Sequence, residues 1–187
     1  MGAGKDTVFQ RLDVLYQRVV KISYARKLKE SVAALFGITL EQIEAWKNDP
    51  DMLLKVGYAG EHGVFHDSFR TFLQRYGTES HRDIFGQNFW LDAALPMGGN
   101  YAYDTIYVVT DVRFPNEVSR VQALGGRVVK VIGTLTDTPA EHASEKVPEK
   151  YDYLIDNVIR NDGFEALDYQ LQHLIEAISP SMKGDRL

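Results

Sequence analysis

The chain has 187 residues, a formal net charge of −5, 44% hydrophobic and 25% charged residues, and no cysteine. This length and composition predict one folded globular domain with its own core. Without cysteine, disulfides, thiolate metal sites and cysteine nucleophiles are excluded. No apolar run approaches the ~20 residues of a membrane helix and no leader pattern opens the chain, so we expect a cytoplasmic protein without a membrane partner. The acidic balance disfavours a nucleic acid polymer as partner.

The first third of the chain predicts a helix, a strand and a second helix. Residues 5–18 carry apolar side chains at helical spacing, and the β-branched run Val19–Tyr24 predicts a short strand. Residues 27–36 predict a helix that ends at Gly37, because glycine readily adopts the left-handed conformation that closes a helix.

The middle of the chain predicts three more helices and one irregular stretch. Thr39 and Gln42 form a capping-box pattern that opens a helix reaching Lys47. Residues 48–66 contain one proline and three glycines, so we expect a loop or a broken helix there. Two further helices are expected over residues 69–77 and 85–95.

The last part of the chain alternates between apolar strands and amphipathic helices. The predicted elements are a strand at 105–110, a helix at 116–124, strands at 127–132 and 153–159, and a helix at 164–178. Apolar strands separated by helices are typical of a parallel sheet covered on both faces. The sequence therefore predicts an α/β protein, a three-layer αβα sandwich whose ligand binds at the carboxyl ends of the strands.

The residues that open the chain form part of a phosphate-binding pattern. Gly2, Gly4, Lys5 and Thr7 give Gly-x-Gly-Lys-x-Thr at the start of a predicted helix. Glycines let the backbone approach phosphate oxygens, amides at a helix start point at the anion, and lysine adds positive charge. The Thr7 hydroxyl would serve the nucleotide or its Mg²⁺. The alternative is a Gly-Lys pair that arose by chance.

The pattern lacks its first half. A complete loop has a glycine five residues before Gly4, preceded by a β-strand, whereas this sequence opens at Met1. The first strand of the sheet is therefore expected to be truncated. We expect a reading frame that was assigned from an internal start codon; the alternative is a protein that lacks the strand and binds phosphate weakly.

A second polar position follows the strand at 105–110. Asp111 comes directly after this strand, where it would reach the ligand edge of a parallel sheet. There it could hold Mg²⁺ or a sugar hydroxyl. The alternative is that Asp111 caps the following helix.

Several segments together resemble one known family. They are GAGKDT (2–7), ARKLKE (25–30), RTFLQRYGTESHR (70–82), Trp90, TDVRFPNE (110–117) and HASE (142–145). These segments resemble the deoxynucleoside monophosphate kinases of tailed bacteriophages, within the P-loop nucleotide kinases. The resemblance implies transfer of the γ-phosphoryl group of ATP to a deoxynucleoside 5′-monophosphate, in the cytoplasm of a bacterial host. It also implies one kinase domain over 1–187, with a helical acceptor-binding insertion at about 26–99 and a short lid at about 136–150.

The resemblance also implies roles for individual residues. Gly2, Gly4, Lys5, Asp6 and Thr7 match the ATP-binding loop, with Asp6 and Thr7 near Mg²⁺, and Lys5 and Arg113 are the implied catalytic residues. The positions that match the acceptor site are Arg70, Gly77, Thr78, Arg82, Trp90, Asp111 and Arg113.

Other interpretations of these residues stay open. Arg70 and Arg82 could be exposed helix arginines, and Trp90 could belong to the core rather than stack on a base. Arg113 is the better candidate, because it follows a strand end in a loop, where packing makes little demand for arginine. The alternative functions are a P-loop kinase for another small phosphorylated metabolite and a non-catalytic nucleotide-binding protein with a decayed loop. The oligomeric state is also open, a homodimer included.

Overall fold

The chain divides into two compact units in the computed structural model. The residues that the structure describes are 4–49, 52–56, 65–133 and 154–179. Unit 1 comprises Met1–Ser23 and Met97–Leu187, and unit 2 comprises Tyr24–Pro96. The sequence-based expectation was a single domain with an insertion at about 26–99. The predicted loop glycine Gly2 and the predicted lid at 136–150 lie outside the described residues.

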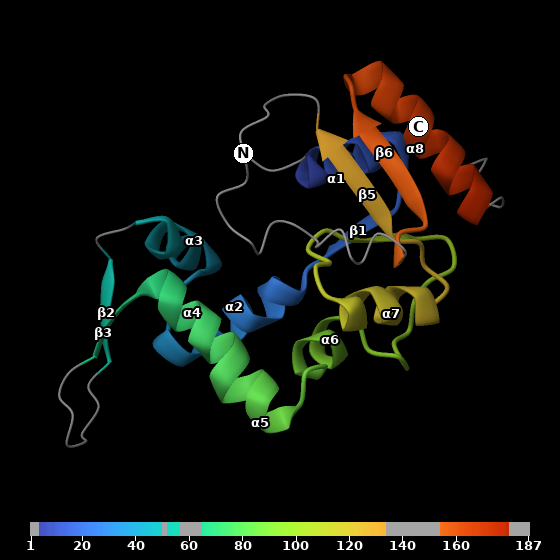
Figure 1. Cartoon of the computed structure of the whole chain (residues 1–187). Coiled ribbons are helices and arrows are strands. Elements are labelled where there is room, and N and C mark those ends of the chain that lie inside the picture. Colours follow the sequence, from blue (N-terminus) through green and yellow to red (C-terminus); the bar gives the residue numbers. More distant parts are fainter. Residues whose placement is uncertain (1–3, 50–51, 57–64, 134–153, 180–187) are drawn as a thin grey trace. The chain divides into compact units, whose positions relative to one another are not determined.

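In the residues that the structure describes, unit 1 is built from parallel strand pairs and helices (Figure 1). Its elements are α1 (Lys5–Leu15), β1 (Val19–Ile22), β4 (Ile106–Val109), α7 (Pro115–Ala123), β5 (Val129–Gly133), β6 (Asn157–Asn161) and α8 (Phe164–Ile178). Strand β1 pairs in parallel with β4, and β5 pairs in parallel with β6. The predicted α/β class with parallel strands is therefore confirmed. The strands form two separate two-stranded sheets rather than the one continuous sheet that we expected.

One hydrophobic core serves both strand pairs of unit 1. Its fully or almost fully buried members come from α1, β6 and α8, and include Val8, Leu12, Ile159, Leu167, Leu171 and Ile175. Val19 and Val108 from one sheet and Val131 from the other pack against this same cluster. Because α1 and α8 share this core with residues of both strand pairs, these helices hold the two sheets together.

A charged pair also joins α1 to α8. The guanidinium of Arg11 donates two hydrogen bonds to the carboxylate of Asp168, with N···O distances of 2.8 and 2.6 Å. These hydrogen bonds raise the pKa of Arg11 above its ordinary value, although burial acts in the opposite direction. The bidentate geometry fixes the orientation of the first helix, and with it the start of that helix.

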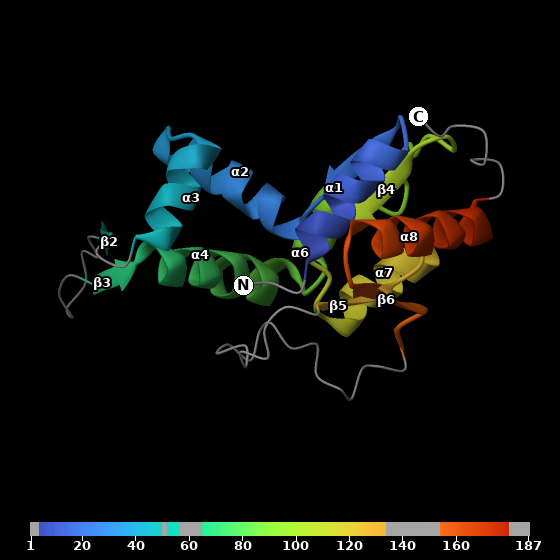
Figure 2. The same cartoon turned by 90° about the horizontal axis from the view of Figure 1, so that it is seen from above.

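Unit 2 is mainly helical (Figures 1 and 2). Its elements are α2 (Tyr24–Phe36), α3 (Leu40–Asn48), β2 (Leu53–Val56), β3 (Phe65–Ser68), α4 (Phe69–Gly77), the π-helical segment η1 (Thr78–Arg82), α5 (Asp83–Phe85) and α6 (Phe89–Ala94). Val32, Ile43, Phe69 and Leu73 form its buried core. This core is separate from that of unit 1, so each unit has its own source of hydrophobic stabilisation.

Two predicted helix boundaries in unit 2, the end at Gly37 and the start at Thr39, are confirmed. The helix predicted over residues 85–95 is wrong in its bounds, because α5 ends at Phe85 and α6 begins at Phe89. The irregular stretch predicted over residues 48–66 is wrong where the structure describes it. Gly37 has a left-handed φ of 65°, and Thr39 exchanges both capping-box hydrogen bonds with Gln42. Within the stretch 48–66, β2 pairs antiparallel with β3 instead of forming a loop or a broken helix. The π-helical segment was not predicted, because its hydrogen-bond pattern has no signature in the sequence.

No helix among the described residues is long and apolar enough to cross a membrane.

Candidate functional site

The amino end of α1 carries the predicted phosphate-binding residues. Gly4 precedes the helix with a left-handed φ of 90°, and its carbonyl accepts the first helical hydrogen bond, from the Val8 amide at 2.9 Å. The amides of Lys5, Asp6 and Thr7 therefore lie in the first turn, where a helix offers them no acceptor of its own. The helix dipole adds partial positive charge at the same place, so this helix end suits an anion.

This helix end lies at the carboxyl ends of strands from both sheets. Asp6 Oδ1 accepts a hydrogen bond of 2.6 Å from Lys21 Nζ, and Lys21 lies next to the last residue of β1. On the other side, Gly4 is so close to Asn161, the last residue of β6, that a Cβ added at Gly4 would lie 2.4 Å from Asn161 Nδ2. Ligands of parallel α/β proteins bind at the carboxyl edge of the sheet. A ligand at this edge stays a prediction.

Asp111 lies at this edge too. Ser23 follows β1 and donates a hydrogen bond of 2.8 Å from Oγ to Oδ2 of Asp111, which follows β4. The alternative role for Asp111 as a helix cap is wrong, because Phe114 is the residue that precedes the first turn of α7. Asp111 is half-buried and is held by the side chain of the residue that follows the neighbouring strand.

Arg113 is presented by a loop that a buried carboxylate fixes. Oε2 of Glu117 accepts hydrogen bonds from the backbone amides of Arg113, at 2.6 Å, and Phe114, at 3.1 Å. Glu117 is only 3% exposed, whereas the Arg113 side chain is exposed. Our sequence analysis missed Glu117 as a positioning residue. The pattern that could have identified it is a glutamate in the first turn of a helix that begins at a proline.

In unit 2, Trp90 is buried rather than presented to a ligand. Its side chain is 4% exposed, and its Nε1 donates a hydrogen bond of 3.0 Å to the carbonyl of Gly77. The rings of Tyr76, His81 and Phe89 lie within 6.4 Å of the indole, centroid to centroid. These contacts favour the core interpretation of Trp90, in which it fixes the backbone where α4 gives way to η1.

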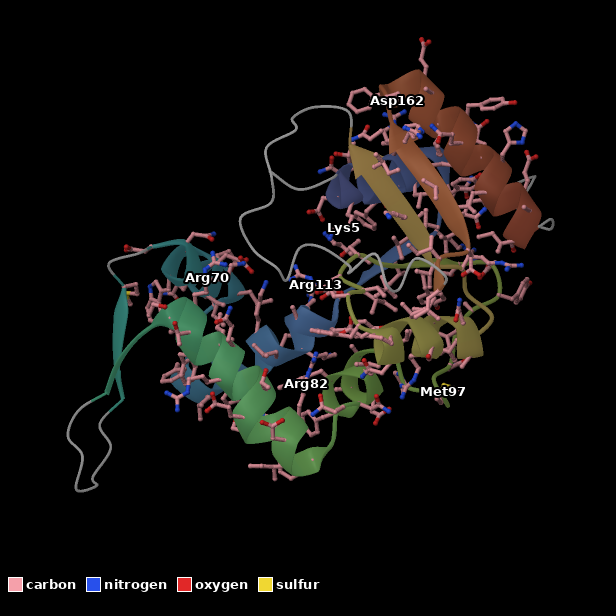
Figure 3. All side chains as sticks on the ribbon, in the orientation of Figure 1. Lys5, Arg70, Arg82, Met97, Arg113 and Asp162 are labelled. Carbon is pink, nitrogen blue, oxygen red and sulfur yellow. The ribbon has the colours of Figure 1, made fainter. Side chains whose placement is uncertain are left out.

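Arg70 and Arg82 lie at opposite ends of one continuous helical stretch (Figure 3). A rise of 1.5 Å per residue separates their Cα atoms by about 18 Å in a regular helix. The exposed Arg70 lies in the first turn of α4 and contacts Oδ1 of Asn48 at 3.4 Å, whereas the half-buried Arg82 ends η1. The structure therefore does not bring these two arginines together around one phosphate group.

Gly77 and Thr78 lie where the regular helix ends. Gly77 is buried, and a Cβ at this position would be 2.4 Å from Cδ1 of Leu28, so glycine permits the close packing of α4 against α2. Thr78 is exposed and opens the π-helical turn. Such turns are rare and occur often at functional sites. Gly77, Thr78, Arg82 and Trp90 form one local cluster, and Arg70 is outside it.

The residues at the start of α1 fit a magnesium-nucleotide only in part. Among the described residues, no group of three or more histidine, aspartate or glutamate side chains could hold a metal ion. Mg²⁺ bound with a nucleotide needs few protein ligands, because water and phosphate oxygens fill most of its positions. The Thr7 hydroxyl suits this role, whereas Asp6 Oδ1 already accepts from Lys21.

Comparison with known proteins gives no relative for this chain. No protein-family model matches the sequence, and no curated protein is significantly similar to it. The assignment of a function therefore depends on the geometry at the strand ends and on the motifs that the sequence carries.

Proposed function

We propose that this protein is a P-loop kinase that transfers the γ-phosphoryl group of ATP to a deoxynucleoside 5′-monophosphate. One observation carries the proposal. The glycine-led start of α1, with Lys5 in its first turn, lies at the carboxyl ends of parallel strands, and Asp111 follows another strand end of the same edge. A lysine and a row of helix-start amides at this edge favour a bound polyphosphate.

Each residue of the first turn would have a separate task. The amides and the Lys5 ammonium would neutralise charge on the phosphates, including the charge that spreads over the transferred group. Thr7 would contribute its hydroxyl to Mg²⁺, and the bound ion would offset the negative charge of the nucleotide. Asp6 would act chiefly through its ion pair with Lys21, which holds the helix start against β1. The acceptor phosphate is already ionised, so the reaction needs no general base.

Acceptor recognition would use arginines and the strand-end carboxylate. Arg113 is exposed on a fixed loop, and its guanidinium can bind a phosphate through two parallel hydrogen bonds. Asp111 would hold a sugar hydroxyl. In unit 2, Arg82 and Thr78 are acceptor contacts that the sequence resemblance implies, and the hydrogen bond from Trp90 to Gly77 holds the backbone before Thr78. Arg70 retains only the support of the sequence resemblance.

The test is the release of ADP from MgATP in a coupled assay with each of the four deoxynucleoside monophosphates. We expect turnover with at least one of them and a loss of about 10²-fold or more for Lys5→Gln and Arg113→Gln, because each removes a charge that stabilises the transition state. Arg160→Gln is the matched control, since Arg160 is exposed on β6 and has no proposed role. Circular dichroism of each variant verifies that it is folded.

The other outcomes separate the alternatives. Turnover with another phosphorylated metabolite, and with none of the four nucleotides, would show a kinase of different specificity. Saturable binding of a fluorescent ATP analogue that Lys5→Gln abolishes, without turnover on any acceptor, would show a nucleotide-binding protein. A folded protein that neither binds ATP nor turns it over would contradict the whole proposal.

A further inference from the structure

The side chain of Gln170 binds the backbone of a neighbouring strand. Gln170 belongs to α8, which lies beside β6 within unit 1 (Figure 1). Its Oε1 accepts a hydrogen bond of 3.0 Å from the Arg160 amide, and its Nε2 donates one of 2.9 Å to the Arg160 carbonyl. Nε2 also donates to the carbonyl of Ala166, at 3.1 Å. Both ends of the side-chain amide are therefore engaged, and its orientation is fixed.

The two backbone groups of Arg160 belong to the outer edge of β6. Within the described residues, β6 pairs only with β5. The Asn157 amide donates to the carbonyl of Val128, just before β5, at 3.2 Å, so Asn157 faces the partner strand. Because backbone groups alternate in direction along a strand, Ile159 also faces β5. The amides and carbonyls of Val158 and Arg160 therefore face outward.

The outer edge of β6 is accessible beside Val158. The Val158 side chain is 55% exposed. A hollow of about 640 Å³ lies between β6 and α8, and Val158 and Gln170 both line it. Tyr169 and His173 of α8 also line this hollow. The space next to Val158 can therefore admit another extended backbone, whereas Gln170 already occupies the groups of Arg160.

Gln170 takes the place of a neighbouring strand at one residue position. A glutamine side chain carries the same groups as a peptide unit, namely a carbonyl oxygen and an N–H donor. It therefore gives Arg160 both of the hydrogen bonds that an added strand would give there. An uncovered strand edge is a template for pairing with another chain, and proteins commonly cover or interrupt such edges.

The outward groups of β6 are complementary to those of a second copy of the same strand. In an antiparallel pair, opposite residues at alternate positions exchange both of their backbone hydrogen bonds. A two-fold axis beside Ile159 would place Val158 of each copy opposite Arg160 of the other. All the outward groups would then be paired, and one surface would be used twice, as in a symmetric dimer. This pairing needs the Arg160 groups that Gln170 occupies.

We propose that Gln170 closes the outer edge of β6 and so prevents this strand from pairing antiparallel with β6 of a second copy of the chain. Without the glutamine amide, Val158 and Arg160 would together offer two donors and two acceptors to that copy. The inference does not depend on kinase activity, because it concerns only β6 and α8.

Gln170→Met tests the proposal. Methionine is similar in length, but it cannot donate to the Arg160 carbonyl and is only a weak acceptor for its amide. Gln172→Met is the matched control, because Gln172 is a half-buried glutamine of the same helix and takes no part in this contact. Amide hydrogen exchange and sedimentation equilibrium are measured over a series of protein concentrations for both variants and the wild type.

At low concentration, we expect the Arg160 amide to exchange about tenfold faster in Gln170→Met than in the wild type, because it has lost its acceptor. As the concentration rises to about 1 mM, which suits a small interface, the mass of Gln170→Met should double. The Val158 and Arg160 amides should become protected in parallel with this increase. The wild type and Gln172→Met should keep the same mass and the same exchange at every concentration.

A second substitution shows whether the association uses β6. Val158→Pro removes a donor from the outer edge but no hydrogen bond between β5 and β6, because the Val158 amide faces outward. In the Gln170→Met background it should abolish the association. Association that persists in this double variant would contradict the proposal, since another surface would then be responsible. An unchanged mass of Gln170→Met at all concentrations, or protection of Val158 that rises with concentration in the wild type, would also overturn it.

Gln170→Glu keeps the proposal testable if methionine prevents folding, which circular dichroism detects. A carboxylate can still accept from the Arg160 amide but cannot donate to the Arg160 carbonyl. We therefore expect this variant to associate more strongly than the wild type and more weakly than Gln170→Met. A folded Gln170→Glu that associates no more than the wild type would contradict the proposal.

Discussion

Glu117 shows how one buried carboxylate can determine the position of an exposed functional group. It lies in the first turn of α7 and is 3% exposed. One of its carboxylate oxygens accepts hydrogen bonds from the backbone amides of Arg113 and Phe114. Burial of a charged group is unfavourable unless hydrogen bonds compensate it. The two amides therefore stabilise the buried carboxylate, and the carboxylate in turn fixes the loop. The result is a rigid turn from which the Arg113 side chain extends.

Replacement of Glu117 is therefore expected to affect both stability and the loop. Glu117→Ala leaves two amides without their acceptor and should cost about 1–3 kcal/mol of unfolding free energy, measured by urea denaturation. Glu117→Gln retains an acceptor oxygen and should cost less. If Arg113 binds the acceptor, Glu117→Gln should raise KM for the monophosphate more than it lowers kcat.

Glu165→Gln is the matched control, because Glu165 also lies in the first turn of a helix but is exposed. Equal stability of all three variants and the wild type would mean that the loop before α7 does not depend on the buried carboxylate.

At the scale of elements, one glutamate of α3 pairs with a lysine of α2 and with a lysine of its own helix. Glu44 of α3 forms ion pairs with Lys29 of α2 and with Lys47, the latter at 2.8 Å. Burial raises the pKa of Glu44, but the hydrogen bonds from the two lysines outweigh it, and the net pKa is lowered. A lowered pKa in the folded state means that the charged carboxylate stabilises unit 2 above the unfolded-state pKa and loses this contribution as the pH falls.

We expect Glu44→Gln to be about 0.5–1 kcal/mol less stable than the wild type at pH 7, since partly exposed ion pairs contribute little more. The difference should shrink as the pH falls from neutral into the acidic range, because the protonated carboxylate, whose pKa is lowered in the folded state, no longer pairs with the lysines. Denaturation curves across this pH range provide the measurement. Glu79→Gln, which removes the more exposed pair with Arg75, is the control, and an equal effect there would argue against a special role for Glu44.

At the scale of the whole molecule, the described part of the chain contains two hydrophobic cores that share no buried residue. Ile43 is central to the core of unit 2 and Leu171 to that of unit 1, and both side chains are fully buried. Because each core stabilises its own unit, loss of packing in one core should lower the free energy of local unfolding of that unit most.

Ile43→Ala and Leu171→Ala form a matched pair for this prediction. Each should cost about 2–5 kcal/mol, since each leaves a cavity in a packed core. Native-state hydrogen exchange should show faster amide exchange within unit 2 for Ile43→Ala and within unit 1 for Leu171→Ala. An equal increase throughout the chain in both variants would instead show a single cooperative unit.

The sequence predicted those elements whose determinants are local. The helix at 164–178 was predicted at both of its ends, and the helix opened by Thr39 has the expected cap, because periodicity and caps depend on neighbouring residues. Residues 48–66 were misinterpreted because their glycines and proline indicated a break, whereas β2 and β3 form an antiparallel pair. Pairing between two strands depends on residues that are separated in the sequence, so a local pattern does not predict it.

The same distinction applies to the candidate site. The glycine, lysine and threonine at the start of α1 formed a recognisable local motif, and Asp111 followed a recognisable strand. Lys21 and Ser23 were not predicted, because Lys21 meets Asp6 only when α1 packs against β1, and Ser23 meets Asp111 only when β1 and β4 pair. Contacts between distant segments could not be inferred from a single sequence.

The insertion of unit 2 between β1 and β4 also bears on the order of folding. These two strands pair in register, Val19 beside Ile106, although the whole of unit 2 separates them along the chain. Closure of so long a loop is entropically unfavourable while the intervening chain is unfolded. The helices of unit 2 rely on contacts closer in sequence, and such contacts form faster. Early folding of unit 2 would shorten the loop to be closed, so the helical insertion would act as an internal folding aid for the parallel strand pair that flanks it.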